Sequence, residues 1–63
     1  MCLSTVYQVE NDNNKMVCQY VSNMEISNDS IKLTDITGEE IEIKGIVRSV
    51  DLIKNVILVE AAK

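Results

Sequence analysis

The chain reads IKLTDITGEEIEIK over residues 31–44, and this stretch decides the fold. Apolar side chains alternate with polar ones on both sides of its centre, a period of two that is typical of strands. Asp35 and Gly38 stand at the first and fourth positions of a four-residue turn, where type I turns favour them. The stretch therefore predicts two antiparallel strands joined by a tight turn. Its alternating apolar residues are Ile31, Leu33, Ile41 and Ile43.

The same alternation continues in both directions from this hairpin. Strands are expected over residues 2–9, 15–20, 24–27, 31–35, 41–50 and 56–60. The polar run from Asn11 to Asn14 predicts a hairpin turn, because short Asx side chains tolerate left-handed backbone. A bend is expected at Ser22 and Asn23, and Gly45 indicates a bulge or a barrel bend. Residues 51–55 predict the last turn, opened by Asp51, and residues 61–63 a frayed tail.

These elements predict an all-β fold, a small SH3-like or Sm-like barrel of five to six short antiparallel strands. Residues 1–63 are expected to form a single small β-barrel domain, since 63 residues can hold only one. Barrel closure removes the exposed edges that make small sheets aggregate. A chain of this size buries only about 60% of the surface that its unfolded form exposes. We therefore expect a homodimer, in which the first strands pair across a two-fold axis.

The charge balance bears on the class of partner. Ten acidic residues against six basic ones give a formal net charge of −4. This sign, with only Tyr7 and Tyr20 as aromatic residues, argues against RNA as a partner. No apolar run approaches the roughly 20 residues that cross a bilayer, and the start of the chain has no basic signal region. We therefore expect neither secretion nor membrane insertion. Two cysteines without a disulfide pattern favour a reduced, cytoplasmic setting.

Enzyme activity is not predicted. The chain has no histidine, so a nucleophile would need Lys, Asp or Glu as its base. No serine or cysteine has a recognisable activating context, and nothing in the spacing of the carboxylates selects an acid and base pair.

Cys2 is the residue with the most chemical potential. Removal of Met1 would place its thiol and a free α-amine on one residue, spaced to close a five-membered chelate ring around a metal ion. Thiolate sulfur with amine nitrogen suits Ni(II) or Cu(II), whereas carboxylate and carbonyl oxygens suit Mg, Ca or Mn. The alternative is that Cys2 starts a strand as a small buried side chain, which is a common use of free cysteine.

Other candidate ligands have structural interpretations. Cys18 lies in the middle of a strand and is expected in or near the core. Met16 and Met24 could offer thioethers to a soft ion, although filling gaps in the core is their commoner use. An acidic cluster around the Gly38 turn is expected to be a solvated face without calcium-loop spacing. Its members are Asp35, Glu39, Glu40 and Glu42.

Taken together, three segments resemble the CooT-type small nickel-binding proteins, which have also been labelled predicted RNA-binding proteins. They are MCLSTVY at residues 1–7, IKLTDITGE at residues 31–39, and the run from GIVRSVD at residues 45–51 to ILVE at residues 57–60. The similarity covers nearly the whole chain. Most of the matching positions belong to strands and turns, and the position specific to the family is Cys2.

The resemblance implies a function and a site. In that family the cysteine at the second position is the nickel ligand, and dimers hold the ion where two amino termini meet. On physical grounds, the Cys2 thiolate, the Cys2 α-amine and the deprotonated backbone amide of Leu3 would give Ni(II) three donors from one terminus, completed by Cys2 of the second subunit. The resemblance also implies a Ni(II) chaperone or reservoir for maturation of a nickel enzyme such as carbon monoxide dehydrogenase. The alternative is a protein- or RNA-interaction module with no metal role.

Overall fold

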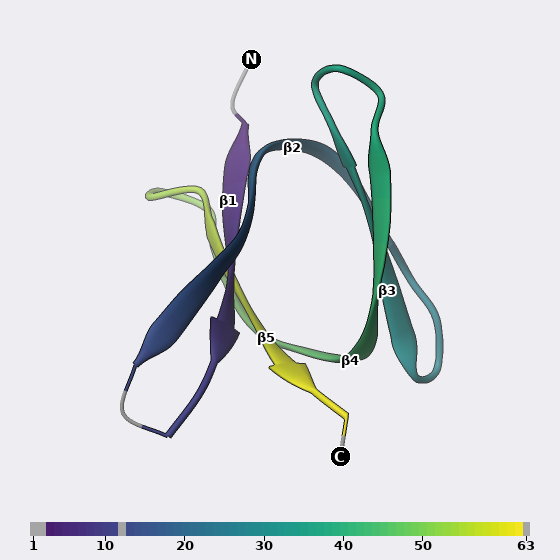
Figure 1. Cartoon of the computed structure of the whole chain (residues 1–63). Coiled ribbons are helices and arrows are strands. Elements are labelled where there is room, and N and C mark those ends of the chain that lie inside the picture. Colours follow the sequence, from purple (N-terminus) through teal and green to yellow (C-terminus); the bar gives the residue numbers. More distant parts are fainter. Residues whose placement is uncertain (1–2, 12, 63) are drawn as a thin grey trace.

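The computed structural model describes residues 3–11 and 13–62 and builds them entirely from strands and turns. The strands are β1 (Ser4–Val9), β2 (Asn14–Ile26), β3 (Ser30–Asp35), β4 (Glu40–Asp51) and β5 (Val56–Ala61). They close into a barrel in the order β1-β2-β3-β4-β5, as Figure 1 shows. The predicted all-β class and the closed arrangement are confirmed.

The pair that closes the barrel departs from the prediction. Sequential neighbours pair antiparallel, but β1 and β5 run parallel, with Val6 opposite Ile57 and Tyr7 opposite Leu58. An odd number of strands that alternate in direction around a ring must bring two parallel strands together. Because β1 has β2 on one side and β5 on the other, it has no free edge between Thr5 and Gln8. Backbone pairing of two first strands in a dimer is therefore not open to this part of the chain.

The strands predicted over residues 15–20 and 24–27 are one strand, β2. Instead of breaking at Ser22 and Asn23, the chain bends through Tyr20, whose φ is 58°, and through a register shift between Val21 and Asn23. The Ser22 hydroxyl lies 3.2 Å from the carbonyl oxygen of Thr34 and can donate to it, which secures the bend against β3. A bulge of this kind turns a strand while keeping it in the sheet. The barrel therefore has five strands.

β4 makes a similar change of partner at Gly45. Residues before it pair with β3, while Gly45 and the residues after it pair with β5, so the predicted barrel bend is confirmed. The bulge itself lies further on, between Val47 and Ser49. Gly45 is required for another reason, since a Cβ atom there would collide with the carbonyl oxygen of Glu60.

The carboxyl-terminal end is more ordered than predicted. Ala61 belongs to β5 and lies opposite Gly45, and the amide of Ala62 donates to the carbonyl oxygen of Lys44 at 2.8 Å. The expected fraying therefore does not apply to these two residues, and Lys63 lies outside the described residues.

The core is small and wholly aliphatic. Ile31 and Leu33 are fully buried while Lys32 between them points outward, as the period of two predicted. Full burial of such a side chain contributes about 1.5–3 kcal/mol to folding. The buried set is Val6, Val21, Ile31, Leu33, Ile57 and Val59.

Candidate metal centre at the amino-terminal end of the barrel

The start of β1 lies at one end of the barrel. Leu3 precedes the strand and is partly exposed, while Ser4 lies opposite Val21 of β2. The amide of Thr5 donates to the carbonyl oxygen of Asn55 at 2.9 Å, which ties β1 to the β4–β5 turn. Cys2, the predicted ligand, lies outside the described residues, so its placement remains a prediction. Leu3, the predicted source of an amide ligand, lies just before the strand ladder.

Large apolar side chains are exposed on the segments around this end, and we refer to them as the apolar rim. Tyr20 comes from the bend of β2, Ile36 from the β3–β4 turn, and Leu52 and Ile53 from the β4–β5 turn. Their exposed fractions are 59%, 63%, 82% and 93% respectively. The amide of Ile36 donates to the carbonyl oxygen of Tyr20 at 2.9 Å, which joins two of these segments. Figure 1 shows both turns at the end of the barrel where β1 begins.

Asp35 builds the β3–β4 turn. Its carboxylate accepts hydrogen bonds from the Thr37 hydroxyl at 2.6 Å, the Thr37 amide at 2.8 Å and the Glu39 amide at 3.1 Å. These bonds, the one from the Thr37 hydroxyl most of all, hold the pKa of Asp35 below its ordinary value. Gly38 has a φ of 92° and donates to the carbonyl oxygen of Asp35, which confirms the predicted turn.

Asp51 has the corresponding role in the β4–β5 turn. Its carboxylate accepts from the amides of Ile53 at 3.0 Å and Lys54 at 2.9 Å, so the prediction that it opens this turn is confirmed. The left-handed φ of 59° at Asn55 then returns the chain to β5. Both aspartates are therefore engaged in local backbone capping.

Cys18 lies opposite Val6 and packs against the core from a half-buried position, as predicted for a structural cysteine. Burial, followed by the nearby carboxylates of Asp35 and Glu39, raises the pKa of its thiol. A protonated thiol is a poor metal ligand, since the thiolate is the form that binds. Met24 packs against the core, as predicted. Met16 was also predicted to fill a gap in the core, but its side chain is 50% exposed.

The acidic cluster remains on the surface. Glu39, Glu40 and Glu42 are exposed, which agrees with the predicted solvated face. Lys32 bonds Glu25 at 3.2 Å, and this bond is the main reason that its pKa is raised. Among residues 3–11 and 13–62, no three His, Cys, Asp or Glu side chains gather closely enough to hold a metal ion.

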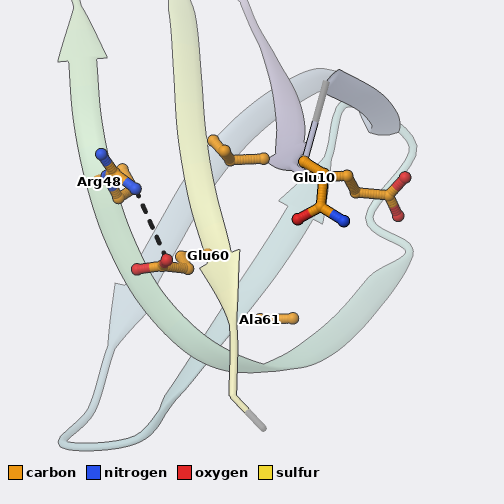
Figure 2. A pocket seen from close by; sticks show the side chains of 6 residues that line it. Glu10, Arg48, Glu60 and Ala61 are labelled. Atoms are coloured by element: carbon orange, nitrogen blue, oxygen red, sulfur yellow. Dashed lines mark ion pairs between the residues drawn. The ribbon is translucent and has the colours of Figure 1, made fainter. Parts of the chain in front are cut away.

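A shallow pocket of about 340 Å³ lies at the opposite end of β1. It contains an ion pair of 3.5 Å between Arg48 and Glu60, both roughly half exposed. Figure 2 shows this pair on one side of the end of β5 and Glu10 on the other side. An exposed pair of this kind contributes about 0–1 kcal/mol. None of the predicted ligands lines this pocket. Arg48, which does line it, lies at the register shift between Val47 and Ser49, and the sequence did not predict this bulge.

The family model described as "CO dehydrogenase accessory protein CooT" matches residues 1–60. The chain belongs to the CooT family. The match includes the position of Cys2 and extends into β5. CooT is described as an accessory protein, which agrees with the expectation that the chain is not itself an enzyme. No curated protein matches the chain.

A solved structure confirms the fold of this CooT family member. The crystal structure assigned to CooT from Carboxydothermus hydrogenoformans superposes with a TM-score of 0.89 at 21% sequence identity. The match covers 98% of this chain and 100% of that one, so the whole barrel is shared.

In the described part of the chain, no helix is long and apolar enough to cross a membrane.

Proposed function

We propose that this protein binds Ni(II) through Cys2 as a homodimer and serves as a nickel chaperone or reservoir for maturation of a nickel enzyme such as carbon monoxide dehydrogenase. The observation that carries the proposal is the CooT family match over residues 1–60, which includes Cys2. The family's description as a CO dehydrogenase accessory protein supports a role in maturation.

The chemistry of the chain's beginning supports nickel as the cargo. With Met1 removed, the Cys2 thiolate and α-amine would bind as a chelate, and the deprotonated amide of Leu3 would add a third donor. Sulfur and nitrogen donors of this kind suit Ni(II). Leu3 directly precedes β1 and is the first residue that the structure describes. In the dimer, Cys2 of the second subunit would complete the ligand set.

The described residues support placing this chemistry on Cys2 and not within the barrel. Cys18 is half-buried with a raised pKa, and the described acidic side chains form no cluster that could hold a metal. A thiolate ligand at the start of the chain also fits a protein of the reducing cytoplasm, where thiols stay free.

The test compares the wild-type protein with Cys2→Ala after addition of Ni(II). The proposal expects a thiolate-to-nickel charge-transfer absorption in the wild type and none in Cys2→Ala. Cys18→Ala is the matched control, since it removes the other thiol and should keep the absorption. Unchanged nickel uptake by Cys2→Ala rejects the proposal.

The alternative is a protein-interaction module in which Cys2 is incidental, and the exposed apolar rim is the observation that favours it. Under this alternative, Cys2→Ala would bind a protein partner as the wild type does, and nickel would change nothing. RNA binding would show a strong salt dependence, because phosphate contacts release counterions. We expect no such binding at physiological salt for a chain with a net charge of −4.

A further inference from the structure

The pocket at the far end of β1 forms where two parallel strands separate. β1 and β5 pair as far as Gln8 and Val59, and the ladder between them ends there. Val9 and Ala61 follow on the two strands, are half-buried and line the pocket. Its volume of about 340 Å³ lies at the lower end of the range for ligand sites, about 300–1,000 Å³. The pocket is therefore large enough for one long side chain of a partner.

The backbone fixes the positions of two acidic residues around this pocket. The amide of Glu10 donates to the carbonyl oxygen of Asn13 at 2.9 Å, which closes the β1–β2 turn. Glu60 lies opposite Ile46, next to the point where Gly45 lets β4 approach β5 closely. Figure 2 shows Glu10 and Glu60 on opposite sides of the end of β5. Two carboxylates thus lie at defined positions on two sides of one pocket.

The charges of the pocket do not balance. Arg48 and Glu60 form an ion pair of 3.5 Å, but both are roughly half exposed, so the pair is weak, about 0–1 kcal/mol, and can be exchanged. Glu10 forms no ion pair with any residue that the structure describes. Two carboxylates therefore lie beside one guanidinium group, in a chain whose net charge is −4. This excess of negative charge favours a cation over an anion as the occupant.

The walls of the pocket indicate which cation fits. Val9 and Ala61 offer apolar surface to an aliphatic stem, and long basic side chains bury such a stem while their charged end stays among polar groups. The side chain of Asn11 also lines the pocket and adds an amide oxygen as an acceptor. A guanidinium group has five donors in a planar fork, whereas an ammonium group is a compact point charge. Acceptors on two sides of the pocket therefore suit a guanidinium group better.

We propose that this pocket binds an exposed arginine side chain of a partner protein. The guanidinium group lies between the carboxylates of Glu10 and Glu60, and the aliphatic stem packs on Val9 and Ala61. The pocket is at the opposite end of β1 from Leu3. This inference goes beyond the proposed nickel role and does not depend on it.

The first test is an NMR titration of the wild-type protein with N-acetyl-arginine amide, which imitates an arginine within a protein chain. The amide resonances of Val9, Glu10, Glu60 and Ala61 should shift in a saturable way. The matched ligand is N-acetyl-citrulline amide, which has nearly the same shape but no charge. It should leave these resonances in place, because the carboxylates then have no cation to bind.

The second test repeats the titration with three variants. Glu10→Gln should raise the dissociation constant of the arginine probe about two- to fivefold, the scale of an exposed ion pair. Glu39→Gln removes the same charge in the β3–β4 turn, at the other end of the barrel, and should leave the constant unchanged. Arg48→Gln should lower the constant by a similar factor, because Glu60 then loses its internal partner and is free for the ligand.

Several results would overturn the proposal. They are a wild-type protein whose four resonances do not shift, equal binding of the citrulline probe, and loss of binding in Arg48→Gln. Tighter binding of free arginine than of the capped probe would also overturn it, since the ligand would then be a free amino acid. Cys2→Ala should bind the arginine probe as the wild type does. If nickel binding fails while the arginine probe binds, the proposed function falls and the pocket assignment remains.

Discussion

At the scale of single residues, chemically similar side chains have different roles because of where they lie. Cys18 is half-buried against the core with a raised pKa, whereas Cys2 belongs to the start of the chain before β1. Asp35 and Asp51 each use their carboxylates to hold a turn. The local sequence around these residues was sufficient to predict the turns, because an Asx cap depends on only a few neighbouring positions.

Cys18→Ala is expected to separate stability from nickel binding. It should lower the free energy of unfolding by about 1 kcal/mol, as removal of a partly buried side chain does. Nickel affinity should remain unchanged. Urea unfolding measures the change in stability, and titration with Ni(II) measures the nickel affinity. If Cys18→Ala, which still has Cys2, lost its nickel affinity, the assignment of Cys2 as the thiolate ligand would be contradicted.

Acid is expected to loosen the β3–β4 turn. The folded pKa of Asp35 lies below its unfolded value, so its stabilising effect is present above about pH 3.9. The effect is lost as pH falls below that value and through the lowered folded pKa. NMR should show the amide resonances of Thr37 and Glu39 moving together in this range. In Asp35→Ala those pH-dependent shifts should be absent, and their persistence would rule out this carboxylate as the cause.

Nickel binding is expected to weaken toward low pH for a separate reason. The Cys2 thiol and α-amine must both lose protons before they bind, so uptake of the ion releases protons. Calorimetric titrations in buffers of different ionisation enthalpy would measure this release at neutral pH. Binding without proton release would contradict a thiolate and amine chelate.

At the scale of elements, alternation predicted the strands but not every boundary. Residues 15–20 and 24–27 were separated in the prediction by Ser22 and Asn23, which are typical of bends. The structure keeps them in one strand because the bend is a bulge that retains pairing with β1 and then with β3. The parallel contact of β1 with β5 joins opposite ends of the chain, so no local pattern could predict its register.

Gly45→Ala tests the close packing of β4 on β5. Because its Cβ would collide with the backbone carbonyl oxygen of Glu60, we expect a loss of about 1–3 kcal/mol in the free energy of unfolding. Gly38→Ala is the comparison, since a Cβ there meets nothing within 4 Å and only the positive φ opposes it. Its cost should be smaller, about 1 kcal/mol. If urea unfolding gave the same loss of unfolding free energy for Gly45→Ala and Gly38→Ala, the close contact with β5 would not be what requires glycine at position 45.

At the scale of the whole molecule, the barrel has a pocket at one end of β1 and exposed apolar side chains on the turns at the other end, where β1 begins. The sequence predicted the all-β class and a candidate ligand at Cys2. It could not predict that Tyr20 and Ile36 lie side by side, because they are far apart along the chain and are joined only when β2 pairs with β3. Their exposure, 59% and 63%, is a property of the closed barrel that the alternation alone did not identify.

The most direct measurement of the central claim is a native mass spectrum of the wild type and Cys2→Ala, each with and without Ni(II). The wild type should have lost Met1 and should show a dimer that carries about one nickel ion, consistent with ligands shared by two termini. Cys2→Ala should fold but show no nickel adduct. A wild-type chain that retains Met1 and takes up no nickel, or a Cys2→Ala protein that takes up as much as the wild type, would contradict the account.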